Sequence, residues 1–367
     1  MDESPLVSIV VNNYNYARFL RDAVMSALAQ TYPRVEVIVV DDGSTDESRE
    51  VIASFGDSVV PVLKENGGQG SALNAGFGAS RGEIVLFLDA DDFLFPQTVE
   101  RVVTCFAPGV AKVHYRLVDG EGNDLGLHPV SSEPLGSGDL VPLLLDTGTY
   151  VTPAMSGNAF AREALQHALP MPADEWRICA DAYLFHTAPF YGQVRALEET
   201  LGVYRLHGGN LWSWVAGSER DPSRERLDAE TFHTGVRDDL RKEELVRRTA
   251  RQLGHRVPED LGMRDWERLR IRISSLRLGP RTHPVASDRR LGLTLRGVRA
   301  AWRAPIATRR KLFRTAWFVA AGLMPTPVAK TAISWVFATH LLPQPLAEGL
   351  ETARRHLLRC RPSPNGG

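Results

Sequence analysis

Short apolar runs alternate with amphipathic segments over the first hundred residues. Runs of strand length occupy residues 7–11, 35–40, 59–63 and 84–88. Between them, apolar residues recur at helical spacing over 19–30 and 69–80, and a further helix is expected after 44–47, where Ser44 and Glu47 have capping-box spacing. Strands that alternate with helices predict an α/β fold, with a mostly parallel, Rossmann-like sheet flanked by helices.

Polar residues follow each of these four strands. The segments after the strands are Asn-Asn-Tyr-Asn at 12–15, Asp-Asp-Gly-Ser at 41–44, Glu-Asn-Gly-Gly-Gln-Gly at 65–70 and Asp-Ala-Asp-Asp at 89–92. In parallel sheets, ligands bind at the carboxyl ends of the strands. We therefore expect the functional residues to lie in these four segments.

Three aspartates, Asp89, Asp91 and Asp92, gather directly behind the apolar strand at 84–88. Several carboxylates at one strand end repel one another unless a cation is bound, and carboxylate oxygens suit Mg²⁺ or Mn²⁺. A solvated acidic turn is the alternative. Position behind a buried strand, beside three other polar strand ends, favours the metal interpretation.

The other segments are less specific. Asp42 is placed to accept hydrogen bonds from a base or ribose, although 41–44 also fits a turn that caps a helix. The glycine-rich segment opens a helix, whose N–H groups suit phosphate. Its sequence is not that of a P-loop.

Together the four segments resemble the family 2 glycosyltransferases, over about ninety residues. The matching text is VSIVVNNYN at 7–15, VVDDGSTD at 39–46, ENGGQG at 65–70 with NAG at 74–76, and ASRGE at 79–83 leading into FLDADD at 87–92. The resemblance implies the A-type nucleotide-diphospho-sugar transferase fold and transfer with inversion. The chain departs from the family at Asn12-Asn13, often Pro-Thr, and at Leu73, often Arg.

The resemblance also implies roles for individual residues. Asp42 would bind the base beside Asn12 and Tyr14, and Asp89 the ribose, while Asp91 and Asp92 would ligate the metal. Further contacts to the nucleotide-sugar donor are expected in the glycine-rich segment and the helix that follows it, at Asn66, Gly70 and Asn74.

A second part of the resemblance lies further along the chain. Residues 152–160 and 176–184 are similar to the family's acceptor segments, although Ala180 stands where the family has Glu. Asp181 is retained and is our candidate general base, with helix capping as the alternative role. At 204–210, His207 is a candidate third metal ligand and Arg205 a candidate diphosphate clamp, against the alternative of ordinary surface residues.

Charge is divided unevenly along the chain. Residues 1–219 hold 13 Lys and Arg against 29 Asp and Glu, whereas residues 220–367 hold 30 against 15. We therefore expect a catalytic domain at 1–218, with donor binding at 1–110 and the acceptor side at 111–218, and a basic helical region at 219–367. Residues 289–342 combine arginines with aromatic and apolar runs. This pattern fits contact with a membrane surface. It fits a helical core or a dimer interface about equally well.

The resulting hypothesis is an inverting transferase that moves a sugar from a nucleotide-diphospho-sugar to a glycan or lipid-linked acceptor in cell-surface polysaccharide synthesis. Polyprenyl-phosphate glycosylation and a catalytically degenerate sugar-nucleotide-binding protein are the alternatives. No secretion signal, spanning segment or nucleic-acid-binding module is evident. The expected location is the cytoplasm, at the inner face of the membrane.

Overall fold

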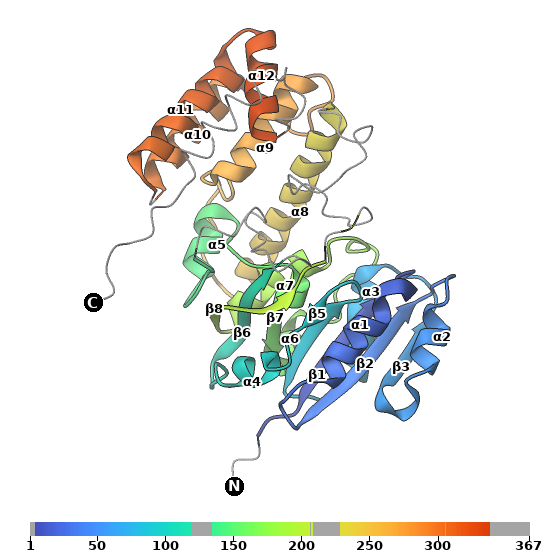
Figure 1. The fold of residues 1–367 in the computed structure, drawn as a ribbon. Coiled ribbons are helices and arrows are strands. Elements are labelled where there is room, and N and C mark those ends of the chain that lie inside the picture. Colours follow the sequence, from blue (N-terminus) through green and yellow to red (C-terminus); the bar gives the residue numbers. More distant parts are fainter. Residues whose placement is uncertain (1–3, 119–133, 206, 208–227, 305, 338–367) are drawn as a thin grey trace, which may run out of the picture. The chain divides into compact units, whose positions relative to one another are not determined.

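The computed structural model describes residues 4–118, 134–205, 207, 228–304 and 306–337 (Figure 1). The chain divides into two compact units. Unit 1 comprises 1–144, 150–218 and 248–253, and unit 2 comprises 145–149, 219–247 and 254–367. Two short segments were not expected from the sequence to belong where they do: 145–149 belong to unit 2, and 248–253 belong to unit 1.

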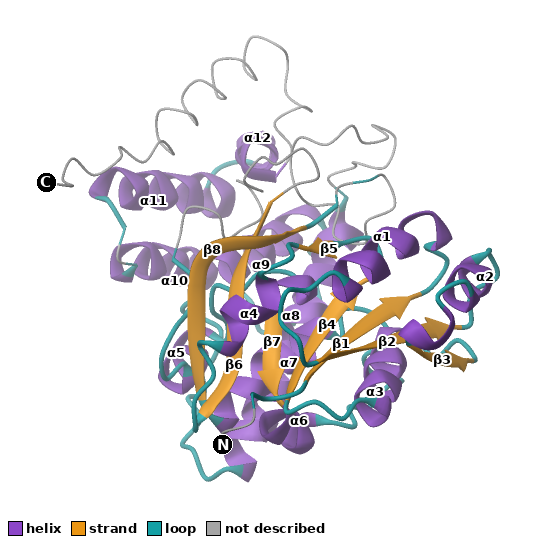
Figure 2. Ribbon diagram, turned by 60° about the horizontal axis from the view of Figure 1, so that its bottom comes forward, coloured by secondary structure: helices purple, strands orange, loops and turns teal. Residues whose placement is uncertain are grey.

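Unit 1 is built on an eight-stranded sheet with the order β3-β2-β1-β4-β7-β6-β8-β5 (Figure 2). The neighbours β3, β2, β1 and β4 pair in parallel, while β7 is antiparallel to both β4 and β6. The mostly parallel α/β fold is therefore confirmed. The strands are β1 (Val7–Asn13), β2 (Val35–Asp42), β3 (Val60–Lys64), β4 (Ile84–Asp89), β5 (Phe93–Leu94), β6 (Val110–Val118), β7 (Asn158–Ala161) and β8 (Gln193–Val203).

Helices cover both faces of this sheet. Successive residues of a strand point to opposite faces; α1 packs in one core with Ile9, whereas α3 lies against Val10. Gly76 of α3 makes that approach possible, because a Cβ built there would lie 2.3 Å from Val10 Cγ1. The helices are α1 (Ala17–Leu28), α2 (Ser48–Ala53), α3 (Gln69–Ala79), α4 (Thr98–Val103), α5 (Val141–Thr147), α6 (Arg162–Ala168) and α7 (Asp181–Thr187).

The predicted capping box is wrong. Helix α2 begins at Ser48 with Glu47 as its N-cap, whose side chain makes no capping bond; Asp46 Oδ1 accepts the Ser48 N–H instead, at 3.1 Å. The Ser44 hydroxyl instead accepts hydrogen bonds from Asn13 Nδ2, at 3.1 Å, and from the Asn15 backbone, at 2.9 Å. Ser44 thus joins the ends of β1 and β2, which is a tertiary role that the local spacing cannot reveal.

Unit 2 is helical, as expected for the basic region. Its helices are α9 (Trp266–Leu278), α10 (Arg290–Arg303), α11 (Thr308–Leu323), α12 (Thr326–Phe337) and the part of α8 (Ala229–Gln252) up to residue 247. Trp266, Trp317 and Phe318 pack edge to face in its core. Within the described parts of the chain, no helix combines the length and apolar character that crossing a bilayer requires.

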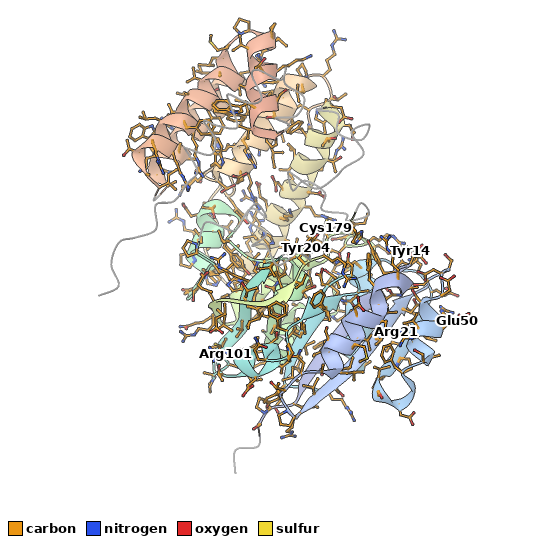
Figure 3. All side chains as sticks on the ribbon, in the orientation of Figure 1. Tyr14, Arg21, Glu50, Arg101, Cys179 and Tyr204 are labelled. Atoms are coloured by element: carbon orange, nitrogen blue, oxygen red, sulfur yellow. The ribbon has the colours of Figure 1, made fainter. Side chains whose placement is uncertain are left out.

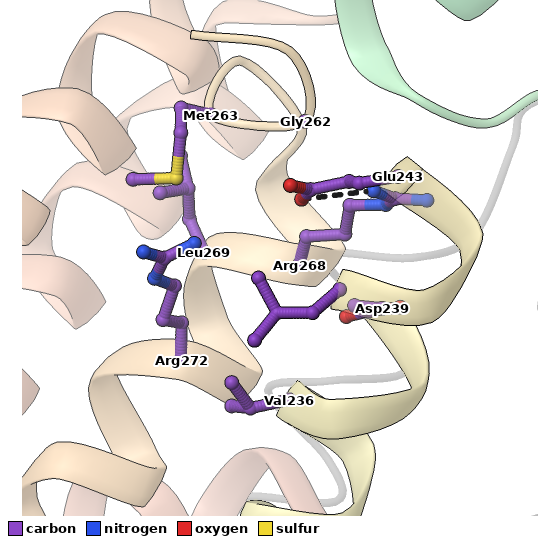
Figure 4. Close-up of a pocket in the computed structure, with 9 residues that line it drawn as sticks. Val236, Asp239, Glu243, Gly262, Met263, Arg268, Leu269 and Arg272 are labelled. Carbon is purple, nitrogen blue, oxygen red and sulfur yellow. Dashed lines mark hydrogen bonds and ion pairs between the residues drawn. The ribbon is translucent and has the colours of Figure 1, made fainter. Parts of the chain in front are cut away.

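A small cavity lies between α8 and α9 (Figure 4). Its lining includes Arg268, whose Nη1 lies 3.1 Å from Glu243 Oε1 in a buried ion pair. The cavity has a volume of about 10 Å³. Roughly 10–15 Å³ is needed to hold one water. It is therefore a packing defect and not a ligand site.

Candidate active site

The ends of β1 and β4 bring Asn12 and Asp89 together. The two residues are direct partners in the parallel pairing of the strands. Both polar atoms of the Asn12 amide are buried, and neither has a hydrogen-bond partner among the described residues. Because buried amides are nearly always hydrogen-bonded, this group indicates a place where a ligand completes the structure.

Asp89, Asp91 and Asp181 form an acidic cluster at this edge. The pKa of the Asp89 carboxyl is raised well above its ordinary value by burial, and then by the negative charges of Asp91 and Asp181. Asp181 begins α7, far from the other two along the chain. The fold therefore brings the predicted base and the predicted metal-binding segment into one site, which we call the acidic site.

His207 contacts this site directly. Its Nε2 lies 2.9 Å from Asp91 Oδ2, and its ring packs against Phe19 and Tyr16, with centroids 4.9 Å and 5.5 Å away. Burial, followed by the charges of Asp91 and Asp89, raises the pKa of Tyr16 to about 12. Tyr16 thus stays protonated at neutral pH beside the carboxylates. Sequence reasoning missed it, since it read the neighbouring Tyr14 as the donor contact.

Tyr14 itself is 46% exposed. Figure 3 shows it with Cys179 at the end of unit 1 opposite Arg101, and therefore at the edge where β1 ends. Its position at that edge agrees with the prediction, but no side-chain contact ties it to the acidic site. Its role in binding a base stays a prediction.

Asp92 was predicted as a metal ligand, but both of its carboxylate oxygens bond within the protein. Oδ2 accepts from the Ser156 hydroxyl at 2.5 Å, and Oδ1 accepts from the Arg205 backbone at 2.9 Å. Ser156 Oγ also accepts the Asp89 N–H, at 3.1 Å. The side chain is buried, and burial, then Asp91 and Asp89, raise its pKa well above the ordinary value, against the effect of those hydrogen bonds. In this structure Asp92 joins the acidic segment to Ser156 and to the Arg205 backbone, and its role as a metal ligand stays a prediction.

Asp42 is likewise engaged by the chain. Its carboxylate accepts from Lys64 Nζ at 2.5 Å, from the Gly67 N–H at 3.0 Å and from the Gly68 N–H at 2.7 Å. A carboxylate has about four lone-pair sites, so three are already used. In this structure Asp42 fixes the glycine-rich loop, a role the sequence did not indicate.

The glycine-rich loop does not present its N–H groups to phosphate, contrary to prediction. Besides Gly67 and Gly68, the Gln69 N–H donates to the Arg177 carbonyl at 2.9 Å and the Gly70 N–H to the Trp176 carbonyl at 3.0 Å. The start of α3 is thereby filled by the segment that leads to α7. The anion site expected from the sequence is occupied by the protein's own carbonyl groups.

Asn66 and Asn74, two further predicted donor contacts, also serve this docking. Asn66 Nδ2 donates to the Asp42 carbonyl, and its Oδ1 accepts from Arg177, at 2.9 and 3.0 Å. Asn74 exchanges two hydrogen bonds of 2.9 Å with the backbone of Met171. The two amides attach the acceptor-side segment to the donor-side helix and do not face the acidic site.

Arg205 does not act as a clamp in this structure. Its guanidinium lies 3.0 Å from Asp22 Oδ2 and stacks over the Phe19 ring, 4.6 Å from the centroid. Only its backbone N–H reaches the acidic segment, through Asp92. The predicted contact with a diphosphate therefore does not follow from the observed geometry.

Lys112, on β6, is a charged group that sequence reasoning missed. Its side chain is fully buried, and Nζ donates to Tyr150 Oη at 2.8 Å and Thr152 Oγ1 at 2.7 Å. Burial lowers its pKa well below the ordinary value, against the opposite effect of the nearby Asp181 carboxylate. Lys112 is therefore a buried amine within electrostatic reach of the predicted base.

Comparisons with known proteins identify the family that part of the chain resembles. Residues 8–161 match the family model described as Glycosyl transferase family 2. An uncharacterized glycosyltransferase of Nostoc sp. is 42% identical over 211 residues, which cover 56% of this chain and 66% of that protein. One from Rickettsia prowazekii is 47% identical over 100 residues, covering 27% of this chain and 31% of that protein. The matches thus span less than two thirds of these relatives.

The fold has a solved counterpart. The crystal structure of S. aureus TarS 1-349 in complex with UDP superposes with a TM-score of 0.51 at 15% sequence identity, covering 95% of this chain and 92% of that one. At that identity the likeness concerns the fold alone. Residues 8–161 therefore form a glycosyl transferase family 2 domain, and the chain has the A-type transferase fold.

Proposed function

We propose that the chain transfers a sugar from a nucleotide-diphospho-sugar to a hydroxyl of a glycan or lipid-linked acceptor, with inversion at the anomeric carbon. One observation carries this proposal. The carboxylates of Asp89, Asp91 and Asp181 come from separate segments and interact electrostatically in one site. A single displacement requires a base close to the site where the donor binds.

We propose that Asp89, Asp91 and His207 hold Mg²⁺ or Mn²⁺ when the donor is bound. The residues fit such an ion, because two mutually repelling carboxylates and an imidazole are an oxygen and nitrogen donor set. Within the described residues, no three such side chains lie in an arrangement that could hold a metal ion by themselves, so the proposal requires the donor to complete the site. Mg²⁺ in particular is usually held by one or two carboxylates together with substrate phosphates. When bound, the ion would neutralise charge on the departing diphosphate.

Asp181 is the proposed general base. Its Oδ1 accepts the Ala182 N–H at 2.8 Å, which fixes the orientation of the carboxylate at the start of α7. The acceptor oxygen forms its bond to the anomeric carbon as the bond to the diphosphate oxygen breaks. The hydroxyl proton passes to Asp181, and the nucleoside diphosphate leaves with the bonding electrons.

The nucleotide is proposed to lie beside the Asn12 amide and Tyr16. The amide can donate and accept hydrogen bonds that the described residues leave unmade. The solved relatives include TarS 1-349 in complex with UDP and with UDP-GlcNAc. We therefore propose a uridine nucleotide as the first donor to test. Residues 1–110 would then form the donor half and 111–218 the acceptor side.

Contact with a membrane is proposed for the basic helices. Helix α10 exposes Leu291, Leu295 and Trp302, and α11 exposes Leu312 and Leu323. Asp288 and Glu348 are separated by a stretch with no acidic residue and ten Lys and Arg. Exposed apolar side chains among arginines suit the interface of an anionic bilayer. This would bring a lipid-linked acceptor to the enzyme at the inner face of the membrane. Residues 338–342 of the predicted segment lie outside the described part of the chain.

A hydrolysis screen tests the reaction. UDP-, GDP- and dTDP-sugars would be incubated with the full chain and Mn²⁺ or Mg²⁺, with EDTA as a control. We expect one nucleotide class to be hydrolysed, only with metal, and Asp91→Asn to abolish that activity. Asp174→Asn, which removes an exposed carboxylate, should leave it unchanged. Hydrolysis that survives EDTA or Asp91→Asn would overturn the proposed metal site.

A further inference from the structure

Unit 2 contains a second, larger cavity that the transfer reaction does not use. It has a volume of about 180 Å³ and lies between helix α10 and the turn that precedes α9. A cavity of this size holds a group much larger than one water, for which roughly 10–15 Å³ is enough. Its lining residues are Asp260, Met263, Arg264, Arg296, Arg299, Ala300 and Arg303. Four guanidinium groups thus surround the space, against one carboxylate.

The charges in this cavity are unevenly balanced. Arg264 bonds to Asp260 through Nε and Nη2, each at 3.1 Å, and its Nη1 contacts Asp146. The carboxylate that lines the cavity is therefore already paired with Arg264. Arg296 also interacts electrostatically with Asp260, but among the described residues neither it nor Arg299 or Arg303 forms a comparable ion pair.

Arg296, Arg299 and Arg303 recur at helical spacing and share one face of α10. None of the three makes a hydrogen bond or ion pair with any described residue. The sequence offers no acidic residue anywhere from 289 to 347 to neutralise them. Three like charges around one cavity repel one another, so a bound anion would stabilise the arrangement.

We propose that this arginine cavity binds a phosphate group. The planar guanidinium forks match the oxygen geometry of phosphate better than any other side chain does. Met263 and Ala300 give the cavity an apolar wall, which strengthens charge-assisted hydrogen bonds by excluding water. The inference does not depend on the proposed transfer reaction, because no residue of the cavity belongs to the acidic site.

The phosphate could belong to a lipid headgroup or to a soluble phosphate ester, and the residues beside the cavity differ in what they offer to each. Leu295 and Trp302, on α10 beside the arginines, are each 49% exposed. A phosphate at the head of a lipid would place its apolar part against such residues, whereas a soluble phosphate ester would not need them. The shared chemistry is the phosphate, and the experiment separates the sources.

The test uses the full chain without donor or metal. One arm titrates inorganic pyrophosphate by calorimetry. The other measures flotation with phosphatidylcholine vesicles that contain phosphatidylglycerol. The cavity variant is Arg299→Gln with Arg303→Gln. The matched control is Arg251→Gln with Arg256→Gln, which removes the same charge from two exposed arginines outside both the cavity lining and residues 289–342. Circular dichroism spectra confirm that both variants are folded.

We expect the cavity variant to lose at least tenfold in affinity in one arm or both, and the control less than threefold. Binding of pyrophosphate identifies a soluble ligand, and binding to vesicles alone identifies a lipid headgroup; either supports the site. Equal losses in the two variants would show general charge attraction and overturn the proposal. Absence of binding in both arms would overturn it as well. Donor hydrolysis measured on the same variants should be unchanged, so failure here is distinct from failure of the catalytic proposal.

Discussion

Replacement of Asp181 by Asn should make the metal-free protein more stable and nearly inactive. The substitution keeps the size of the side chain and the Oδ1 that accepts the Ala182 N–H. It removes one negative charge from the acidic site, where burial, Asp91 and Asp181 all raise the pKa of the Asp89 carboxyl. A side chain that lowers the stability of the protein but is required for the reaction behaves as a catalytic group does.

The magnitude follows from two opposing effects. Two like charges in one protein site repel one another by about 1 to 3 kcal/mol at an effective dielectric constant near 20. Loss of a carboxylate from the first turn of α7 forfeits roughly 0.3 to 1 kcal/mol of interaction with the helix dipole. The free energy of unfolding should therefore rise by about 1 kcal/mol. Loss of general-base catalysis should lower the transfer rate by about 10² to 10⁴-fold.

Urea unfolding at pH 7.5 in EDTA measures the first quantity, and sugar transfer with Mn²⁺ measures the second. Asp174→Asn is the matched control, because Asp174 is exposed and lies in the loop before α7. It should change neither value. If Asp181→Asn is less stable, the carboxylate makes net stabilising contacts, which contradicts the predicted repulsion in the acidic site. Unchanged transfer would remove it as the base.

Three further predictions test other parts of the account. Because burial lowers the pKa of Lys112, the unfolded chain binds more protons between that value and about 10.4. Stability should therefore rise with pH through this window. Lys112→Met should abolish the rise and be at least as stable at pH 7, as urea midpoints from pH 7 to 10 would show. Ser156→Ala removes a hydroxyl that accepts the Asp89 N–H and donates to the Asp92 carboxylate. This substitution should weaken Mn²⁺ binding by about 10 to 100-fold. An unchanged affinity by calorimetry would contradict this. Gly76→Ala should destabilise by about 1 to 3 kcal/mol through its clash with Val10. Gly78→Ala, with nothing within 4 Å, should stabilise the helix by up to about 1 kcal/mol, and equal thermal shifts for the two would refute the packing argument.

The fold was predicted from patterns in short stretches of sequence. The apolar runs and helical periodicity of the first hundred residues specify parallel strands covered by helices, and β1, β2 and β4 formed as expected. The pairing of strands in the far half of the sheet was not predicted. There β7 enters antiparallel between β4 and β6, a pairing of segments distant in sequence that no local periodicity encodes.

The site was partly predictable for the same reason. Asp89 and Asp91 follow a buried strand, so their position could be inferred from the sequence alone. The roles of Asp42 and the glycine-rich loop could not, because they depend on the docking of Trp176 and Arg177 against α3. Identical residues would face a phosphate if that segment lay elsewhere.

Lys112 was missed because its strand alternates polar and apolar residues, a pattern typical of a sheet face in contact with water. The sequence there reads Ala-Lys-Val-His-Tyr-Arg-Leu-Val. In the structure this face is covered, and Lys112 and His114 are both fully buried. Burial of a charged residue depends on which elements cover the strand, which composition does not show.

Binding of Mn²⁺ with and without UDP tests the central claim most directly. Electron paramagnetic resonance of Mn²⁺ reports the bound fraction without any acceptor or turnover. The account predicts weak binding by the protein alone and at least tenfold tighter binding with UDP, because the diphosphate completes a shell begun by Asp89, Asp91 and His207. Asp91→Asn should abolish this enhancement. An Mn²⁺ affinity that UDP leaves unchanged, or an enhancement that persists in Asp91→Asn, would contradict the assignment of the acidic site.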